Sequence, residues 1–414
     1  MGMDYGALNE YVSGVMCKEM PGIDIPGANR SHQHEFQGSG PLRHLLGDVE
    51  RRSIPSRFLY LDDSGEAVCD VGSMSWYDAR KNQPRRHPEW RLYYSENEPV
   101  KHAHIGDTLT LVLLRDDSLV ALVTRRNSSI DTQVKWLFGL DDESRRIRNY
   151  VVGSNETLRI DATASNILEA LGIDVHVPQS AEDMLEDMLR RFPRGLPSTE
   201  EFSAYCRTTL GDVDYVHDDP DEIIYMAYQR EEMLFRAYER HEAEQVFPKF
   251  VNPIDVDGIL SYSMSLFQRR KSRAGKSLEH SVEALLTARN IRHTAQATTE
   301  NHETPDFLFP SEELYHDKKF PASGLTLLGA KTTCKDRWRQ VLSEGKRVER
   351  KHLVTLEGAI STRQTDDMRA KNLQLVVPVP LHCTYTDEQQ GWLWSVGQFF
   401  DLVKAREQEY AIYF

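Results

Sequence analysis

Three residues in the C-terminal third of the sequence have the side chains needed to hydrolyse a phosphodiester bond. Asp306 follows Pro305, Lys331 stands 25 residues later, and Glu344 a further 13 residues on. Carboxylate oxygens are the ligands that Mg²⁺ prefers, and the ion keeps part of its shell for water and substrate phosphate. A lysine beside it can orient the attacking water and offset charge on the pentavalent phosphate. Such a spacing also arises by chance, so its meaning depends on the surrounding elements.

The neighbouring residues predict how these three side chains could meet. Asp306 opens a short apolar run, residues 306–309, and Lys331 follows another, residues 325–330. Two such strands could carry both side chains to one rim of a sheet, and a helical pattern then carries Glu344. Strands alternating with helices predict an α/β layer in this part of the chain. The other elements predicted here are strands at 352–356 and 373–378 and helices at 277–290 and 387–408.

Residues 1–155 have a mostly-β pattern. Short apolar or alternating runs are separated by turn residues such as Gly106-Asp107. These runs lie at residues 58–61, 91–94, 108–114 and 119–123. The pattern predicts a small barrel or sandwich. A looser stretch over residues 156–180, with a short helical pattern at 164–171, predicts the connection to a second domain spanning 181–414.

The second domain begins with a block of helices, residues 181–260. Apolar residues at three- and four-residue spacing predict helices at 181–191, 199–208 and 220–246. The block is acidic, so it is expected to serve packing and dimerisation rather than to form a site. The catalytic core is expected at residues 265–385.

The charge of the chain is unevenly distributed. Its 414 residues carry a net charge of −14, of which −11 falls within residues 182–260. The remainder contains three basic clusters, at 80–91, 269–276 and 331–351. Lysine and arginine that contact phosphate provide most sequence-independent affinity for nucleic acid, so the clusters favour a nucleic-acid partner. A solvated basic surface is the alternative for each of them.

The sequence contains no candidate membrane span, because its apolar runs are far shorter than the ~18 residues a span requires. The first residues, Met1-Gly2-Met3-Asp4, resemble neither a secretory signal nor a lipidation motif. The protein is therefore expected to be cytoplasmic and to keep away from membranes. Its five widely spaced cysteines are expected to be reduced thiols.

Four ordered blocks of the sequence closely resemble the catalytic domain of EcoRII-type restriction endonucleases. They are residues 269–279 (RRKSRAGKSLE), 305–311 (PDFLFPS), 315–317 (YHD) and 331–340 (KTTCKDRWRQ). The similarity extends over about residues 181–385. It implies a PD-(D/E)xK endonuclease fold that cuts double-stranded DNA with Mg²⁺, acts as a homodimer, and has a companion DNA methyltransferase in its host.

The resemblance also implies roles for individual residues. Asp306 would bind the metal, Lys331 would be the catalytic lysine, and Glu344 would be a displaced second acid. Glu279 would be a supporting acid and metal ligand, with an ordinary helix acid as the alternative. In the common form of the motif an acid stands two residues before the lysine, where this chain has Gly329. Tyr315 is a further catalytic candidate, although packing of its ring in the core is favoured.

The triplet Lys335-Asp336-Arg337 lies where the family reads bases. Arginine or lysine can donate to guanine O6 and N7, and aspartate can accept from cytosine N4. The resemblance thus implies a recognition site with a CC/GG core, of the CCWGG kind; a solvated charge run is the alternative. The other residues expected to contact DNA in this domain are Arg339, Arg269, Arg270, Lys271, Arg273 and Lys276.

Residues 75–123 look like a distant relative of the B3-like pseudobarrel that EcoRII-type enzymes carry at their N-terminus. That domain binds a second copy of the site as an effector or autoinhibitory module. Trp76 is expected to belong to the barrel core, while Trp90 could pack there or stack on DNA. The residues expected to contact phosphate or bases are Arg80, Lys81, Arg85, Arg86 and Arg91.

The sequence therefore predicts a type II restriction endonuclease with an N-terminal DNA-binding domain. A DNA-binding regulator that has lost cleavage is one alternative, and the presence of Asp306, Lys331 and Glu344 together argues against it. An endonuclease of the same fold whose N-terminal domain senses modified DNA is the other. Cleavage of methylated and unmodified DNA would separate the two endonucleases.

Overall fold

The computed structural model describes the chain apart from residues 1–6, 27–33, 39, 64–66, 83–85, 141–149, 152–159, 161–163, 165–166, 170, 174–179 and 335–336. The chain divides into two compact units. The N-terminal unit comprises Asp4–His176 with Ala359–Ser361, and the C-terminal unit comprises Val177–Gly358 and Thr362–Phe414, with residues 1–3 assigned to it. The division falls inside the predicted connection 156–180, most of which lies outside the described residues.

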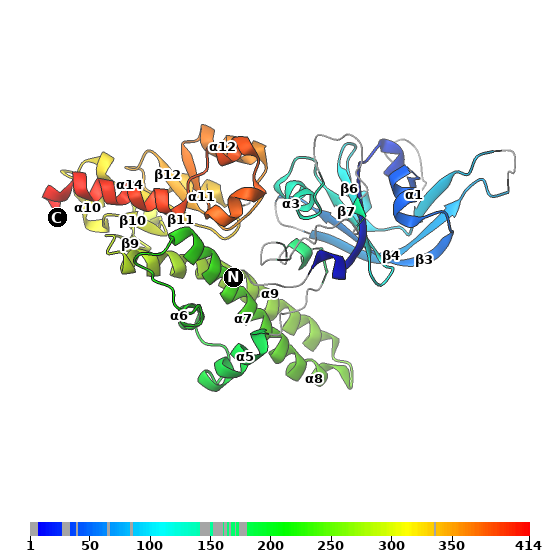
Figure 1. Ribbon diagram of the computed structural model, residues 1–414, viewed down its shortest axis with the longest axis horizontal. Coiled ribbons are helices and arrows are strands. Elements are labelled where there is room, and N and C mark those ends of the chain that lie inside the picture. Colours follow the sequence, from blue (N-terminus) through cyan, green and yellow to red (C-terminus); the bar gives the residue numbers. More distant parts are fainter. Residues whose placement is uncertain are drawn as a thin grey trace. The chain divides into compact units, whose positions relative to one another are not determined.

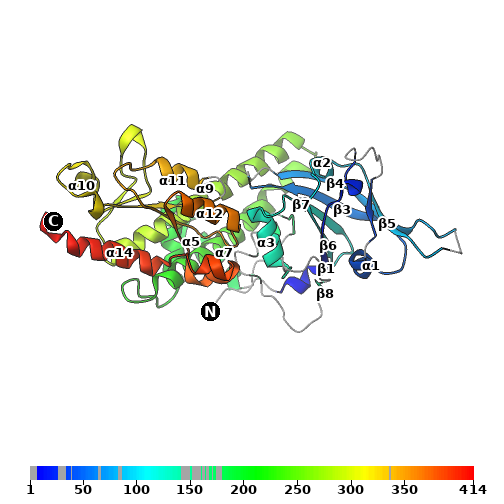
Figure 2. The same ribbon diagram turned by 90° about the horizontal axis from the view of Figure 1, so that it is seen from above.

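The N-terminal unit is built on an eight-stranded sheet in the order β2-β5-β4-β3-β7-β6-β1-β8, which curls on itself (Figure 2). All neighbouring strands are antiparallel except β3 and β7. The strands are β1 Val12–Glu19, β2 Glu35–Gln37, β3 Arg51–Leu61, β4 Ala67–Asp78, β5 Trp90–Tyr94, β6 Thr108–Leu114, β7 Leu119–Thr124 and β8 Tyr150–Val151. Every residue of β6 and β7 is buried, as expected of strands with continuous apolar sequence.

Short helices complete this unit. They are α1 Gly40–Leu46, α2 Glu98–Lys101 and α3 Ser129–Leu137, with the 3-10 helices η1 Leu8–Glu10 and η2 Gly22–Asp24. Trp76 is fully buried, donates from its indole N–H to the Gly47 carbonyl at 2.9 Å, and stacks on Trp90 with 5.1 Å between ring centroids. The expectation that Trp76 belongs to the core is confirmed. Trp90 is partly buried and packs against the same core.

The C-terminal unit begins with a helical layer (Figure 1). Its helices are α5 Ser180–Arg191, α6 Thr199–Thr208, α7 Pro220–Val246, α8 Pro248–Val251 and α9 Val256–Ala288. The predicted bounds of α6 and α7 match the structure, because both starts carry strong signals. The Ser198 hydroxyl and the Glu201 carboxylate form a capping box, and Asp219 caps a helix with Pro220 in its first turn.

Helix α9 is much longer than predicted. The sequence indicated a helix over 277–290, but α9 begins at Val256 and spans 33 residues. The predicted break between residues 260 and 265 therefore falls inside this helix. Its apolar stripe at Val256, Leu260, Met264 and Phe267 is interrupted by charged and small residues, which hides the period. The Asp255 side chain caps its first turn.

The rest of the unit surrounds a five-stranded sheet in the order β13-β12-β11-β10-β9. Strand β10 is antiparallel to β9 and β11, while β11, β12 and β13 are parallel. The strands are β9 Thr294–Ala295, β10 Phe307–Phe309, β11 Thr326–Ala330, β12 Lys351–Val354 and β13 Leu373–Val376. The helices are α10 Glu312–His316, α11 Trp338–Ser343, α12 Thr362–Ala370, α13 Asp387–Gln390 and α14 Val396–Glu409, with η3 Glu300–His302, η4 Ala322–Gly324, η5 Val379–Thr384 and η6 Ala411–Tyr413.

The helix predicted over 387–408 is two helices. The chain turns at Gly391, and the Ser395 hydroxyl caps a new helix, α14. One ring of α14, Phe399, packs against Phe309 of β10 at 5.6 Å between centroids. The buried Asp221 carboxylate at the start of α7 accepts hydrogen bonds from the Val396 and Gly397 amides at 2.8 and 3.0 Å. This contact joins α7 of the helical layer to α14, whose Phe399 packs on the five-stranded sheet.

None of the helices in the described residues combines the length and apolar character needed to cross a membrane.

Candidate functional site

The pairing of β10 with β11 brings Asp306 and Lys331 together. Because the strands are antiparallel, the residue before β10 lies beside the end of β11. The Lys331 ammonium contacts Asp306 Oδ2 at 2.5 Å, and the Ala330 amide donates to the same oxygen at 2.7 Å. Both side chains are largely shielded from solvent, with exposed fractions of 11% and 7%. The two residues thus meet at one edge of the sheet.

Gly329, two residues before the lysine, has no room for a side chain. A Cβ atom placed there would lie 2.7 Å from Val341 Cγ2 and 3.4 Å from Leu353 Cδ1. Val341 belongs to α11, which covers this face of β11. An acid at position 329 would therefore collide with the helix. The close approach gives a physical reason why a second acid in this site must come from another position.

Glu344 supplies a carboxylate from the end of α11. It is the residue at which the helix ends, and its Oε2 atom is buried without a hydrogen-bond partner. Burial raises the pKa of Glu344 to about 7, and the neighbouring Asp306 carboxylate raises it further, whereas Lys331 lowers it. Two acids and a lysine are thus within electrostatic reach of one another.

Sequence reasoning missed two charged residues beside Glu344. Glu303 has a buried Oε2 atom without a hydrogen-bond partner, and its charge raises the pKa of Glu344. Lys351, the first residue of β12, is buried, and desolvation lowers its pKa while Glu344, Glu303 and Glu300 oppose that change. A lysine that opens an otherwise apolar strand was a signal for Lys351. Nothing in the sequence distinguishes Glu303.

Glu279 is connected to Asp306 through the side chain of Gln296. Its Oε2 atom accepts from Lys276 Nζ at 2.8 Å and from Gln296 Nε2 at 3.2 Å. The same Gln296 amide donates to Asp306 Oδ1 at 3.3 Å, and the Gln296 backbone N–H donates to the Asp306 carbonyl at 3.0 Å. Gln296 therefore links Glu279 to Asp306, and direct coordination by Glu279 stays a prediction.

Tyr315 is 1% exposed, as the core-packing alternative required. Its hydroxyl donates to Glu300 Oε2 at 2.6 Å and accepts from the Arg347 backbone N–H at 3.4 Å. The hydroxyl is thus directed to the turn after Glu344 rather than to Asp306 or Lys331. Burial, followed by the bond to Glu300, raises the pKa of Tyr315 to about 12.

The chemistry of Asp306 and Glu344 fits a hard divalent cation. Both offer carboxylate oxygens, and the orphaned Glu344 Oε2 is a buried acceptor that an ion could satisfy. In the part of the chain that the structure describes, no three His, Cys, Asp or Glu side chains are already spaced to hold a metal. The predicted third ligand, Glu279, accordingly does not complete a three-residue cluster.

The predicted base-reading triplet is only partly described. Lys335 and Asp336 lie outside the described residues. Arg337 stands exposed immediately before α11, and the exposed Arg339 guanidinium covers the Trp338 ring at 4.6 Å. Because Glu344 ends α11, this one short helix separates the triplet from the displaced acid.

The basic cluster 269–276 is largely engaged within the molecule. Arg270 donates to both oxygens of the buried Glu239 on α7, and Arg269 pairs with Glu242 on the same helix. Arg273 donates to the Pro197 carbonyl at 2.7 Å and lies over the Phe202 and Phe235 rings at 4.8 and 5.4 Å.

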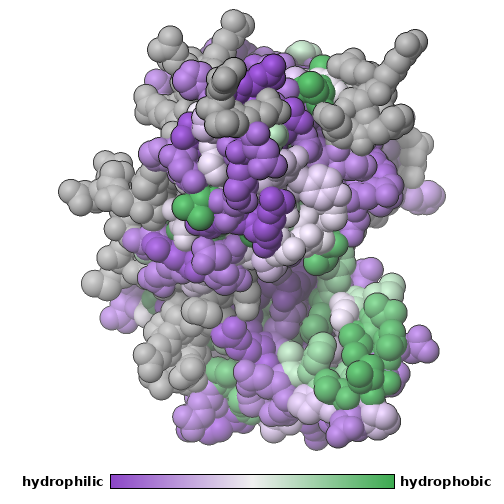
Figure 3. All heavy atoms as spheres, turned by 90° about the vertical axis from the view of Figure 1, so that its right-hand side faces the viewer, coloured by the Kyte–Doolittle hydropathy of each residue, from purple (hydrophilic) through white to green (hydrophobic). Residues whose placement is uncertain are grey.

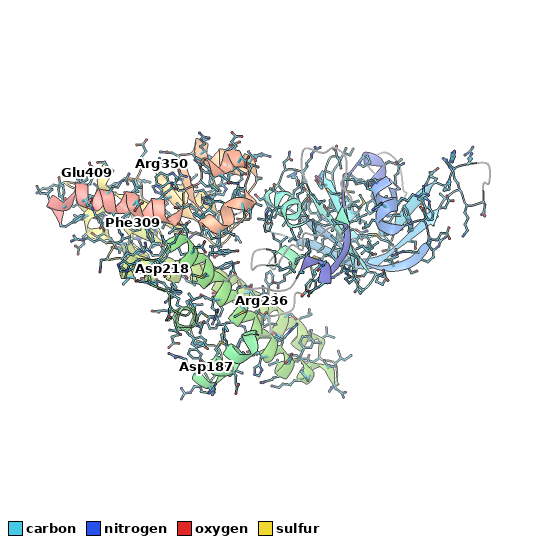
Figure 4. The ribbon with its side chains drawn as sticks, viewed as in Figure 1. Asp187, Asp218, Arg236, Phe309, Arg350 and Glu409 are labelled. Atoms are coloured by element: carbon cyan, nitrogen blue, oxygen red, sulfur yellow. The ribbon has the colours of Figure 1, made fainter. Side chains whose placement is uncertain are left out.

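Arg236 of α7, labelled in Figure 4, adds ion pairs with Glu232 at 2.7 Å and Glu239 at 3.7 Å. The structure thus corrects the simple view of a free basic surface, because α7 provides acidic partners. The exposed Lys276 ammonium is held by Glu279, and nothing is described of the Lys271 side chain. DNA contacts by these residues stay predictions.

The basic residues predicted in the N-terminal unit have acidic neighbours too. Arg91 pairs with Glu35 at 2.7 Å and with Glu89 at 2.6 Å, and Arg80 also pairs with Glu89. Lys81 contacts Glu50 at 3.0 Å. Arg86 is exposed, and Arg85 lies outside the described residues. DNA contact by any of these side chains stays a prediction.

Comparison with known proteins identifies the family. The family model described as EcoRII C terminal matches residues 235–400. The type II restriction enzyme EcoRII of Escherichia coli is 35% identical over 379 residues, which cover 90% of each chain. Two solved structures of metal-depleted Ecl18kI, one with uncleaved, modified DNA and one with uncleaved DNA, each align with a TM-score of 0.43 at 20% identity. They cover 56% and 55% of this chain and 86% and 85% of theirs.

These matches agree with the site and with the mixed α/β architecture, and they confirm the family and the fold class predicted from the sequence. The identity to EcoRII extends over both units, so the N-terminal sheet is part of the match. The chain belongs to the EcoRII family of type II restriction enzymes, and is therefore a DNA-binding, site-specific deoxyribonuclease.

Proposed function

We propose that this enzyme makes Mg²⁺-dependent double-strand cuts at a short DNA site with a CC/GG core, of the CCWGG kind. The observation that carries the proposal is the contact of Lys331 with Asp306 beside the orphaned Glu344 carboxylate. That combination supplies the acids and the lysine that metal-assisted hydrolysis requires. The CC/GG specificity rests on the family and on the triplet at residues 335–337.

Each residue has a distinct part in the proposed reaction. Asp306 and Glu344 would hold Mg²⁺, which supplies Lewis-acid stabilisation of charge on the phosphate when bound. Lys331, held in place by Asp306, orients the water for in-line attack and offsets negative charge as the phosphorus becomes pentavalent. The products would carry 5′-phosphate and 3′-hydroxyl ends. The Ala330 amide keeps the Asp306 carboxylate directed toward the lysine.

We assign the N-terminal unit a regulatory DNA-binding role. Its curled sheet and its exposed Arg86 are compatible with binding a second copy of the site, as an effector or autoinhibitory module. A unit that senses modified DNA is the second candidate. A host that carries this enzyme is expected to hold a DNA methyltransferase that protects its own sites.

We also propose a homodimer, since a symmetric site is most simply cut by two symmetric active sites. The exposed stripe of α9 supports this. Val256, Leu260, Met264 and Phe267 recur every three or four residues along the helix and are 57–68% exposed. Phe247, Val251 and Ile254 continue the apolar surface onto α8, and Figure 3 shows such a patch at its lower right.

The size of this surface agrees with that of a dimer interface. Seven large apolar side chains, each roughly half exposed, present on the order of 700 Å² of surface, close to the ~800 Å² that each partner contributes to a standard interface. A helix stripe packed antiparallel against its own copy would make a self-complementary contact. A second copy of this chain is therefore the proposed occupant.

Digestion of plasmid DNA tests the nuclease proposal. Unmethylated and methylated plasmids would be incubated with the purified protein and Mg²⁺, with and without a site-bearing oligonucleotide, and the ends sequenced. Discrete cuts at CC/GG-containing sites are expected, and Asp306→Asn should abolish them. Cutting at unrelated sequences would overturn the specificity, and cutting only of methylated DNA would favour the modified-DNA sensor.

Sedimentation of a charged variant tests the dimer. Leu260→Glu with Met264→Glu should convert a dimer of the full chain to a monomer. Val71→Glu, at an equally exposed valine of the N-terminal unit, is the matched control and should leave the dimer intact. A wild-type protein that sediments as a monomer with DNA bound would contradict the proposal.

A further inference from the structure

The turn that follows Glu344 is held in place by several contacts with the rest of the unit. After Glu344 the chain reverses at Gly345, whose φ of +58° lies in the left-handed region, and the Val348 N–H donates to the Gly345 carbonyl at 2.9 Å. A Cβ at Gly345 would lie 2.7 Å from Leu327 Cδ1, so the turn is pressed against β11. Residues 344–348, here called the acid turn, therefore tolerate little displacement.

One side of the acid turn is fastened by Tyr315 and Glu300. Glu300 Oε2 accepts from the Tyr315 hydroxyl at 2.6 Å and from the Lys346 backbone N–H at 3.2 Å. The Tyr315 hydroxyl in turn accepts from the Arg347 N–H at 3.4 Å. The Arg347 guanidinium donates to the Phe320 carbonyl at 2.6 Å. Two consecutive amides of the turn thus donate to the side chains of the half-buried Glu300 and the buried Tyr315.

The other side is fastened by Lys351. Its ammonium donates to the Val348 carbonyl at 2.9 Å, at the end of the acid turn. Strand register explains why it reaches this place. Lys351 is two residues before Leu353, which lies against Gly329, so both side chains point to the face of the sheet that α11 covers. Glu344 is on that face as well.

The Lys351 side chain carries its charge in a buried position. A buried ammonium is expensive unless negative charge stands near it. Glu344, Glu303 and Glu300 provide that charge. Glu344 is thus within electrostatic reach of two lysines, Lys331 beside Asp306 and Lys351 beyond the acid turn.

We infer that Lys351 is a positioning residue for DNA cleavage, which holds the acid turn, and with it the Glu344 carboxylate, through the Val348 carbonyl. Tyr315 and Glu300 hold the same turn from its other side. The catalytic candidate Tyr315 thereby acquires a role without contacting substrate. This inference rests on the proposed function of Asp306, Lys331 and Glu344.

The Mg²⁺ dependence of cleavage tests this inference. In Lys351→Met the Mg²⁺ concentration for half-maximal cleavage by the full-length enzyme should rise about 10- to 100-fold, as is usual when a residue behind a metal ligand is removed. High Mg²⁺ should restore most of the rate, and DNA affinity measured without metal should be unchanged. Lys371→Met is the matched control, because that exposed lysine of the same unit lies outside the acid turn and should leave the Mg²⁺ dependence as it is.

Two more conservative variants show whether an effect of Lys351→Met comes from misfolding. Tyr315→Phe keeps the buried ring but removes the hydroxyl, and should shift the Mg²⁺ dependence in the same direction by about 3- to 10-fold. Lys351→Arg keeps the charge and should recover part of the wild-type behaviour. If both Lys351→Met and Tyr315→Phe lower the melting temperature without moving the Mg²⁺ midpoint, the role is only structural and the inference is wrong.

The Asp306→Asn variant distinguishes a failure of the proposed active site from a failure of the positioning role of Lys351. An inactive Asp306→Asn with an unshifted Lys351→Met would refute the positioning role alone. An Asp306→Asn variant that cuts at the wild-type rate would refute the proposed active site, and the inference with it.

Discussion

The helical layer and the proposed active site both bury charged side chains, and the two regions differ in how those side chains are paired. Between α7 and α9, Arg270 donates two hydrogen bonds of 2.9 Å to the buried Glu239, so both oxygens of that carboxylate have a partner. At the proposed active site, Glu344 and Glu303 each have a buried carboxylate oxygen without a hydrogen-bond partner. A buried carboxylate with hydrogen-bond partners stabilises the fold. A buried carboxylate oxygen without a partner lowers the stability of the free protein, and a bound cation can compensate for that loss.

The largest effect is expected from the lysine that touches Asp306. Lys331→Ala should lower the cleavage rate by about 10³-fold or more, a loss within the range for a residue that activates the nucleophile. DNA binding should remain within a few-fold of wild type, because the lysine is largely buried. Single-turnover cleavage and gel-shift titration measure the two. Lys371→Ala, at an exposed position of the same unit, should cut normally; equal rates for both variants would refute the site.

Glu344→Gln should separate activity from stability. Removing the charge should lower cleavage about 100-fold, since a carboxylate proposed to hold Mg²⁺ is lost. The same change should raise the free energy of unfolding by on the order of 1 kcal/mol at pH 8, because an incompletely paired buried carboxylate disappears. Denaturant unfolding of the metal-free protein measures this. A loss of stability would mean that Glu344 is a structural residue like Glu239, and the contrast between the two regions would vanish.

Arg270→Met tests the paired region. It removes both 2.9 Å hydrogen bonds to the buried Glu239 and leaves that carboxylate only the longer Arg236 contact at 3.7 Å, which should lower the free energy of unfolding by about 2–3 kcal/mol. Arg269→Met, whose partner Glu242 is more exposed, should lose only about 1 kcal/mol. Cleavage at low temperature should be unchanged in both. Loss of DNA affinity without loss of stability would instead restore Arg270 to the predicted DNA contacts.

Glu231→Gln should remove a pH dependence from the helical layer. Burial raises the pKa of Glu231 to about 7, while the Ser203 hydroxyl, which donates at 2.8 Å, opposes the rise. A folded-state pKa above the unfolded value means that stability is full below about pH 4.5 and is lost as the pH rises through 7. The unfolding free energy should therefore fall by roughly 2 kcal/mol more in wild type than in the variant between pH 5 and 8.

Thermal or urea unfolding at both pH values measures that difference. Glu200→Gln, at an exposed position of α6, should fall as the wild type does. Identical pH profiles for wild type and Glu231→Gln would show that the carboxylate is ionised in the folded protein.

Local signals in the sequence were sufficient for much of the fold. The strand at 108–114 and the helices at 199–208 and 220–246 were predicted with the bounds that the structure has, since each is a long periodic run with clear end signals. The contact between Asp306 and Lys331 also followed from two adjacent strand ends. These features depend on residues that are near one another in sequence or belong to one motif.

What could not be predicted depends on pairing between distant elements. The arginines at 269 and 270 resemble a DNA surface until α7 places Glu242 and Glu239 beside them. Lys351 has no connection to Glu344 in the sequence, because the register of β11 and β12 brings it to the same face. Whether a charged side chain is buried and paired depends on the whole fold, whereas the periodicity of apolar residues can be read from a short segment of sequence.

The packing at Gly329 also constrains how this active site could evolve. A nuclease with the acid two residues before the lysine could not arise here by one substitution, because the new side chain would meet Val341 2.7 Å away. Val341 would first have to shrink, which leaves a cavity and lowers stability while the acid is still absent. Either single step is unfavourable by itself. The proposed second acid could therefore move from Glu344 to position 329 only through paired changes.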